Sequence, residues 1–530
     1  MGRLPVVLFA VVVLEDVARG FVLLSSGPRL PPRLKVGEEG GLEEAVKRQA
    51  PTMLYDVKGP ADLKNEELPW WWDSFWALPF TEAGEPGTEL RLGDSMRIFK
   101  SNIEQIYGGA ESFDGAPLAE GDISGLADGT LYLGLHEYAK RFGSVYKLCF
   151  GPKSFLVISD QNCAKHVLRE NFQNYDKGVL AEILEDIMGK GLIPADPATW
   201  KVRRRAIVPA FHKRWLERMC AMFADKTESL LATFEEENEQ VIDMEERLGS
   251  LALDIIGTAV FNYDFESVSD ASPVVQAAID TLREAEHRSV TPAPYWKIPG
   301  ATRLVPRQVR FRKNMDLLNS ELNKCIAAAL ENRDEADVEQ LEQRDYSTMD
   351  NPSLLRFLVD ARGEETSSKQ LRDDLMTMLI AGHETTASAL TWCLFELAQA
   401  PDILKELRAE LDGRPTPRTL EEVSQLQFTR LCVAESLRMY PQPPLLIRRA
   451  LDEDKLPPVS AIETTHAGGG GTYETRLPRA CDIFINVYSL HRSEKYWEHP
   501  DTFDPSRFLR PFRNPDEPSW AGFDPSKWLG

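Results

Sequence analysis

An acid and a hydroxyl lie side by side within an apolar, helix-like stretch, at Glu384 and Thr385. They come shortly after Ala381 and Gly382. Because Gly and Thr both lower helix propensity, we interpret this stretch as a place where the helix opens locally. An opening at Gly382 leaves room for a diatomic ligand, which Thr385 could hydrogen-bond and to which Glu384 could relay protons through water. The alternative is a buried helix kink without chemistry.

A carboxylate and two arginines have the spacing of an ion-pair lock. Glu435 and Arg438 are three residues apart and therefore share one face of a helix. Alone this pair is a weak signal, because Glu-x-x-Arg occurs by chance in many helices. Its weight comes from Arg507, which follows in a Phe-x-Pro-x-Arg-Phe sequence. One carboxylate between two planar guanidiniums makes a rigid, buried lock.

Two further segments offer cations to an anionic ligand. Trp200 and Arg204 are four residues apart on one helix face, so an indole N–H and a guanidinium can together hold a carboxylate. The alternative is a solvated basic face. Arg449 ends an apolar strand and could meet a second carboxylate, whereas we interpret Arg448 as a side chain that faces solvent.

The elements that must position these residues are mostly helices. Apolar periodicity predicts helices near residues 160–171, 200–223, 225–237, 244–260, 308–332, 368–399 and 420–439. A hairpin near residues 144–159 and short strands near 445–450 and 482–488 add a little β structure. The expected fold class is therefore mainly α with small β-sheets.

Composition limits the function classes. The chain has 530 residues and a formal net charge of −22, which argues against nucleic acid as a general partner. Its seven cysteines are scattered, odd in number and without a Cys-x-x-Cys pair, so we expect no disulfide framework or zinc cluster.

The N-terminal part of the sequence predicts a targeting segment followed by an extension. Residues 1–20 have the apolar core of a signal peptide, and residues 21–50 begin with an acid-free, basic stretch that is typical of a transit peptide. A plain secretory signal is the alternative. Residues 51–114, with the aromatic cluster Trp70–Trp76, form the extension, and residues 115–530 form the main domain.

The four motifs in this order resemble the cytochrome P450 superfamily, and segments such as Phe261-Asn262-Tyr263 resemble its plastid carotenoid hydroxylases. The resemblance implies an incomplete P450 fold and a haem b cofactor. It implies that Glu384 and Thr385 activate oxygen and deliver protons, and that Glu435, Arg438 and Arg507 form a structural triad under the haem. It further implies that the haem is bound by Trp200, Arg204, Ala381, Gly382 and Arg449.

The implied reaction inserts one atom of O2 into a ring C–H bond of a carotenoid, in a plastid and with peripheral membrane contact, for which Trp70–Trp76 is a candidate anchor. A ferredoxin-type protein would supply electrons and is acidic. We therefore expect it to dock on the basic residues of one region, which are Lys201, Arg203, Arg205, Lys213 and Arg214.

The sequence departs from the family at its iron ligand. The haem-binding cysteine should follow Phe508 in a characteristic loop, and none of the seven cysteines stands in such a frame. We expect the axial cysteine and the last helix beyond Gly530, in a chain that is C-terminally truncated. Two other hypotheses stay open: a non-catalytic P450-like protein, and an isomerase or dehydratase of the same fold that needs no O2.

Overall fold

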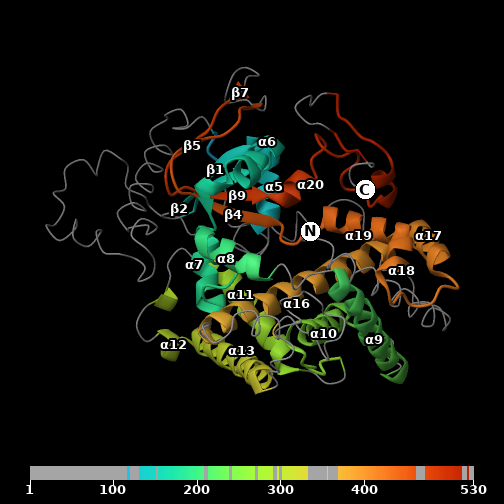
Figure 1. Ribbon diagram of the computed structural model, residues 1–530. Coiled ribbons are helices and arrows are strands. Elements are labelled where there is room, and N and C mark those ends of the chain that lie inside the picture. The colour runs from blue at the N-terminus through green and yellow to red at the C-terminus, as the bar shows by residue number, and fades with distance from the viewer. Residues whose placement is uncertain are drawn as a thin grey trace, which may run out of the picture.

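Helix α16 (Ser368–Gln399) runs through the helical half of the fold, and a small sheet covers the other half, as the computed structural model shows (Figure 1). The helix lies within a large apolar cluster, and much of its surface is buried on several sides. The structure describes residues 116–119, 131–150, 153–207, 213–237, 241–268, 272–290, 295–297, 301–331, 355, 368–460, 472–515 and 522–524.

The other α-helices are α5 (Leu131–Phe142), α6 (Gln161–Lys165), α7 (Val179–Met188), α8 (Pro197–Ile207), α9 (Lys213–Glu237), α10 (Met244–Ile256), α11 (Pro273–Val290), α12 (Ala301–Leu304), α13 (Pro306–Glu331), α17 (Pro401–Leu411), α18 (Leu420–Gln425), α19 (Gln427–Met439) and α20 (Val487–His491). Two π-helical turns extend α6 and α10, at His166–Glu170 and Gly257–Phe261. Short 3-10 turns lie at Phe172–Asn174, Tyr295–Lys297 and Pro505–Leu509.

The main sheet has the strand order β1-β2-β9-β4-β3. Its strands are β1 (Val145–Phe150), β2 (Lys153–Ile158), β9 (Asp482–Asn486), β4 (Leu445–Ala450) and β3 (Tyr175–Asp176). β2 and β9 run parallel, and the other neighbours are antiparallel. Two small sheets pair β5 (Asp454–Lys455) with β8 (Arg476–Leu477) and β6 (Val459–Ser460) with β7 (Thr472–Tyr473).

α16 packs closely on α10 because small residues face the contact. A Cβ added to Gly382 would lie 2.4 Å from Ile256 Cδ1, so only glycine fits there. One residue further on, His383 is buried against the backbone of Gly249. Burial lowers the pKa of His383 to about 4, which makes its imidazole neutral near pH 7.

The predicted fold class is confirmed. The predicted boundaries differ from the structure in several places, including the three below, and α7, α11 and α17 were not predicted. α9 runs without a break through residue 224, where two separate helices were expected. The helix expected near residues 420–439 is broken at Leu426 into α18 and α19. β9 ends at Asn486, because that side chain accepts a hydrogen bond from Ser489 N and caps α20.

Several predictions concern residues outside the described part of the chain. They include the signal peptide, the transit peptide, the extension and the cluster Trp70–Trp76. Among the described helices, none combines the length and the apolar character that crossing a bilayer requires.

Candidate active site

One stripe of α16 is half-buried, whereas most positions around it in the middle turns of the helix are buried. The stripe consists of Met378, Ala381, Thr385, Ser388 and Trp392, which follow each other at helical spacing. Ala381 lies one turn before the threonine, and Ser388 lies one turn after it. Both side chains are small, so the Thr385 hydroxyl has no bulky neighbour along the stripe at these two positions.

Glu384 and Thr385 lie together as predicted, but the helix is not opened at Gly382. α16 is helical across this residue, and the Thr385 hydroxyl donates to Ala381 O at 2.7 Å. The expected opening is therefore wrong: Gly382 serves close packing on Ile256. Thr385 can offer its hydroxyl to a ligand only by exchanging this back-bond.

The Glu384 carboxyl is a candidate proton carrier. Burial raises its pKa, the nearby Glu245 raises it further, and Arg283 partly opposes them. Glu245 is exposed at the start of α10. A carboxyl with a raised pKa, between a half-buried stripe and an exposed acid, holds its proton more readily than an ordinary glutamate and can pass it on.

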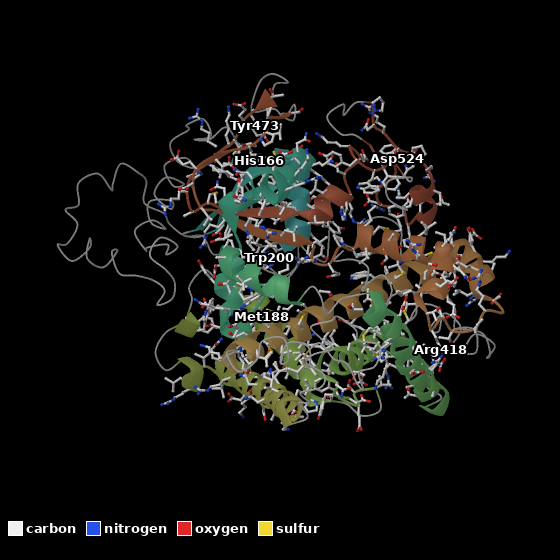
Figure 2. The ribbon with its side chains drawn as sticks, in the orientation of Figure 1. His166, Met188, Trp200, Arg418, Tyr473 and Asp524 are labelled. Atoms are coloured by element: carbon white, nitrogen blue, oxygen red, sulfur yellow. The ribbon has the colours of Figure 1, made fainter. Side chains whose placement is uncertain are left out.

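α8 carries the predicted anion-binding pair. Asp196 accepts hydrogen bonds from Ala198 N and Thr199 N at the start of this helix. Arg204 lies over the Trp200 ring, with 5.4 Å between the guanidinium carbon and the ring centroid. In Figure 2, Trp200 is seen between the sheet above and α16 below.

Arg203 does not belong to a solvated basic face. It is 7% exposed, and its Nη1 donates to Asp374 of α16 at 3.2 Å. This buried pair holds α8 to α16, so the prediction of Arg203 in a docking patch is wrong. The side chains of Arg205, Lys213 and Arg214 lie outside the described part of the structure.

A cation that was not predicted to bind a ligand, Lys177, lies within electrostatic range of Arg448 and Arg204 near the N-terminal end of α7. Lys177 precedes this helix, and burial together with the charges of Arg448 and Arg204 lowers its pKa to about 8. Within the described residues these three cations form no ion pair with a carboxylate. They therefore form a site that an anion with two carboxylates would stabilise.

Arg449, which was predicted to contact a carboxylate of the cofactor, is held by carboxylates of the protein. Its Nε and Nη2 donate to Asp482 at 2.9 and 2.8 Å, and its Nη1 donates to Glu182 at 2.6 Å. All three donor groups are thus bound to carboxylates of the protein itself. Strand alternation turns the neighbouring Arg448 to the opposite face, where it is half-buried rather than solvated.

The ion-pair lock is built as the spacing predicted. The Glu435 carboxylate accepts from Arg438 Nε at 2.8 Å and Nη2 at 2.9 Å, and from Arg507 Nε at 2.8 Å. Glu435 is 0% exposed, and the arginines are almost as buried. A backbone donor, Asp504 N, completes the shell at 3.0 Å.

Both arginines of the lock also hold the loop that follows α20. Arg438 Nη1 donates to His491 O at 2.6 Å, and Arg507 Nη1 donates to Glu498 O at 2.6 Å. The lock therefore joins α19 to residues 491–507, which are far from it in sequence. The lock has a structural role in the fold, as expected.

Five of the described cysteines are poor iron ligands as they stand. Burial raises the pKa of five thiols, which are Cys163, Cys220, Cys325, Cys393 and Cys432. A thiolate rather than a thiol binds metal. No group of His, Cys, Asp and Glu among the described residues could hold a metal ion. The axial cysteine predicted beyond Gly530 lies outside them.

Together these residues fit a flat, dianionic cofactor. Three cations without carboxylate partners among the described residues match two carboxylates at one edge, and an indole adds a donor. The α16 stripe offers a face with small side chains on both sides of a hydroxyl. Lys177 was not predicted because no motif marks it. Arg448 was not predicted to face a ligand because the orientation of its side chain depends on strand register.

Comparisons with known proteins identify the family. The family model "Cytochrome P450" matches residues 121–523. The chain is similar to the chloroplastic cytochrome P450 97B2 of Glycine max, with 51% identity over 83% of this chain and 76% of the relative. It is also similar to two Arabidopsis thaliana proteins. The chloroplastic protein LUTEIN DEFICIENT 5 is 41% identical over 77% of this chain and 66% of its own, and the chloroplastic carotene epsilon-monooxygenase is 39% identical over 76% and 73%.

Proposed function

Because the chain belongs to the cytochrome P450 family, we propose that it is a haem-thiolate monooxygenase that inserts one oxygen atom from O2 into a ring C–H bond of a carotenoid. The half-buried stripe of α16, with the Thr385 hydroxyl between the small residues Ala381 and Ser388, carries the proposal. The substrate class rests on the relative named as a carotene monooxygenase, and the plastid location on the relatives named as chloroplastic.

The cofactor is proposed to be haem b. Its two carboxylates match the cations Lys177, Arg448 and Arg204, and Trp200 adds an N–H donor. A haem with a thiolate ligand supplies O–O bond cleavage and the oxidising power for C–H attack. The protein's residues bind the cofactor at one edge and shape the space beside its face.

Proton delivery is proposed for Glu384 and Thr385. Thr385 would exchange its bond to Ala381 O for a hydrogen bond to O2 beside the haem and would so orient it. Glu384, whose pKa is raised by burial, gives up a proton through water and regains one from the side of exposed Glu245. Net consumption of two protons and two electrons per O2 leaves one oxygen atom in the product and one in water.

Labelled oxygen tests the proposal. The protein is supplied with haem, a reducing system, a carotene and 18O2, and the product is analysed by mass spectrometry. We expect a hydroxylated carotenoid that carries one 18O atom, with O2 consumed. A converted carotenoid without O2 uptake would instead indicate an isomerase or dehydratase, and a bound carotenoid without conversion would indicate a binding protein.

An acidic, ferredoxin-type protein is proposed as electron donor, docking where α8 exposes Lys201 and the apolar Val202, which is 70% exposed. Lys201→Glu should raise KM for the donor several-fold at low ionic strength and leave kcat unchanged, because a charge at the rim steers association. The effect should disappear near 1 M salt, where the screening length is about 3 Å.

Lys140→Glu is the control for this prediction, since Lys140 is an exposed lysine of α5 that pairs with Glu137. A salt-independent KM in the unmodified protein would exclude electrostatic docking at this surface.

Because carotenoids dissolve in membranes, we further propose that the protein makes peripheral membrane contact. We also propose a bipartite presequence at residues 1–50.

A further inference from the structure

The last residue of the half-buried stripe of α16 is a tryptophan that stacks on a tyrosine. Trp392 lies two helical turns after Thr385, about 10 Å further along the axis. Its ring is nearly parallel to that of Tyr440, the residue that caps the end of α19, with 4.0 Å between the centroids and 6° between the planes. Aromatic pairs more often lie offset or edge to face at about 4.5–7 Å, so these two π-systems overlap unusually closely.

The tyrosine has a proton acceptor of its own. Its hydroxyl donates to Glu396 Oε1 at 2.6 Å. Glu396 lies one turn after Trp392 in α16, is 9% exposed, and forms no ion pair with any of the described residues. Burial raises the pKa of Tyr440, and the Glu396 carboxylate raises it further, so the phenol keeps its proton in the resting protein.

Packing alone does not explain this choice of residues. The contact between α16 and α19 could be filled by apolar side chains, without a phenol oxygen or a carboxylate. Burying a carboxylate that no neighbouring cation neutralises costs free energy, which an apolar residue at position 396 would avoid. The phenol and the carboxylate therefore indicate a use for the proton that they share.

A guanidinium lies over the same tyrosine ring. The Arg492 guanidinium carbon is 5.4 Å from the ring centroid of Tyr440 and 4.7 Å from that of Tyr488. Its carboxylate partner, Asp501, is 79% exposed and therefore largely screened by water. A cation beside a ring opposes the loss of an electron from that ring. Tyr440 can thus be oxidised readily only if its phenolic proton leaves as well, and Glu396 is placed to receive it.

Resting on the monooxygenase proposed above, we propose that Trp392, Tyr440 and Glu396 form a redox relay that removes oxidising equivalents from the haem site when no substrate is attacked. Trp392 gives one electron to a haem that has reacted with O2, and takes one electron from Tyr440, whose phenolic proton moves to Glu396. A small thiolate then returns one electron to Tyr440 and becomes a thiyl radical, and the proton moves back. The three side chains are restored, and one electron of the thiolate is consumed.

The test uses zinc protoporphyrin IX, which carries the same two carboxylates as haem b and needs neither O2 nor an iron ligand. A light flash in the presence of hexaammineruthenium(III), which accepts one electron, converts the bound porphyrin into a one-electron oxidant. Transient absorption then measures how fast the oxidised porphyrin is reduced within the full chain, and electron paramagnetic resonance identifies the radical formed. In the unmodified protein we expect rapid reduction and a tyrosyl radical.

Two aromatic substitutions test the path of the electron. Trp392→Phe keeps an aromatic ring that is much harder to oxidise, and it should slow reduction of the porphyrin about tenfold, as a barrier higher by about 1.4 kcal/mol would. Tyr440→Phe keeps the stack but removes the phenol, so the tyrosyl radical should disappear. Tyr295→Phe is the control, because Tyr295 also pairs with a tryptophan, Trp296, but in the turn before α12. It should change neither the rate nor the radical.

Glu396→Gln tests the path of the proton. The amide oxygen can still accept a hydrogen bond from the Tyr440 hydroxyl but does not take up its proton. An oxidised Trp392 should therefore persist, and the yield of tyrosyl radical should fall several-fold, while thermal unfolding stays close to that of the unmodified protein. Glu406→Gln, at an exposed position of α17, is the matched control and should leave the tyrosyl radical unchanged.

The possible failures give different signals. Equal rates of porphyrin reduction in Trp392→Phe and in the unmodified protein would overturn the relay at its first step. An equal yield of tyrosyl radical in Glu396→Gln would overturn Glu396 as the proton acceptor. Zinc protoporphyrin IX that tumbles freely beside the protein, as seen from low fluorescence anisotropy, would instead remove the proposed cofactor site and, with it, the oxidant of the relay.

Discussion

Glu435→Gln is expected to cost about 3–5 kcal/mol of folding free energy, because it leaves two buried guanidiniums around a neutral amide. Arg438 and Arg507 are 3% and 5% exposed, and water cannot replace the lost charge. Domains of ordinary stability unfold with about 5–15 kcal/mol, so the variant should melt far below the unmodified protein. Denaturant unfolding followed by circular dichroism measures the loss, and haem retained on a desalting column gives a second readout.

Arg418→Gln is the matched control. This arginine also binds two carboxylates, Asp225 at 2.5 Å and Glu228 at 2.8 Å, but its side chain is 43% exposed. Figure 2 places it at the outer edge of the molecule. Exposed pairs contribute roughly 0–1 kcal/mol, so this variant should unfold almost as the unmodified protein does. Equal losses of folding free energy in the two variants would show that burial does not make the Glu435 lock more stabilising than an exposed ion pair.

Glu384→Gln is expected to lower the rate of carotenoid hydroxylation about 100-fold while haem content and substrate binding persist. The amide keeps the size of the side chain but has no proton to give, and general acid catalysis is typically worth about 10²–10⁴ in rate. O2 and electrons should still be consumed, with reduced oxygen released as hydrogen peroxide. The ratio of product formed to O2 consumed, measured in the same reaction, is therefore the decisive quantity.

Thr385→Val should cause the same uncoupling, because it removes the hydroxyl and keeps the shape. Thr391→Val is the control: Thr391 donates to Ala387 O at 2.9 Å, the same back-bond in the same helix, but it lies off the stripe that runs through Thr385. Similar uncoupling in both valine variants would mean that the back-bond, rather than the position within the stripe, matters. Full coupling in Glu384→Gln would require another proton source.

The lock was predictable because its chemistry is local in sequence. Glu435 and Arg438 share a helix face by spacing alone, and Arg507 stands in a frame whose Phe and Pro fix its turn. The bounds of α16 and β4 also agree with prediction. Such features depend on neighbours within a few residues, which the sequence displays directly.

The cation site was not predictable in the same way. Whether Arg448 or Arg449 faces a ligand depends on how β4 pairs with β3 and β9, and a shift by one residue exchanges the two faces. Lys177 depends on Asp482, which is about three hundred positions away and fixes the adjacent Gly178. The sequence predicts a solvated Arg203, whereas in the structure its guanidinium donates to Asp374. These are long-range contacts, and no local pattern specifies them.

The parallel pairing of β2 with β9 has a consequence for how the chain is made. The β1–β2 hairpin is synthesised early, but the strand that covers its other edge, Asp482–Asn486, emerges late. Until then Phe155–Ile158 forms an apolar edge with unpaired backbone groups, and such edges promote aggregation. The sheet can close only after most of the polypeptide has left the ribosome, so we expect nascent chains to need chaperone protection at this hairpin.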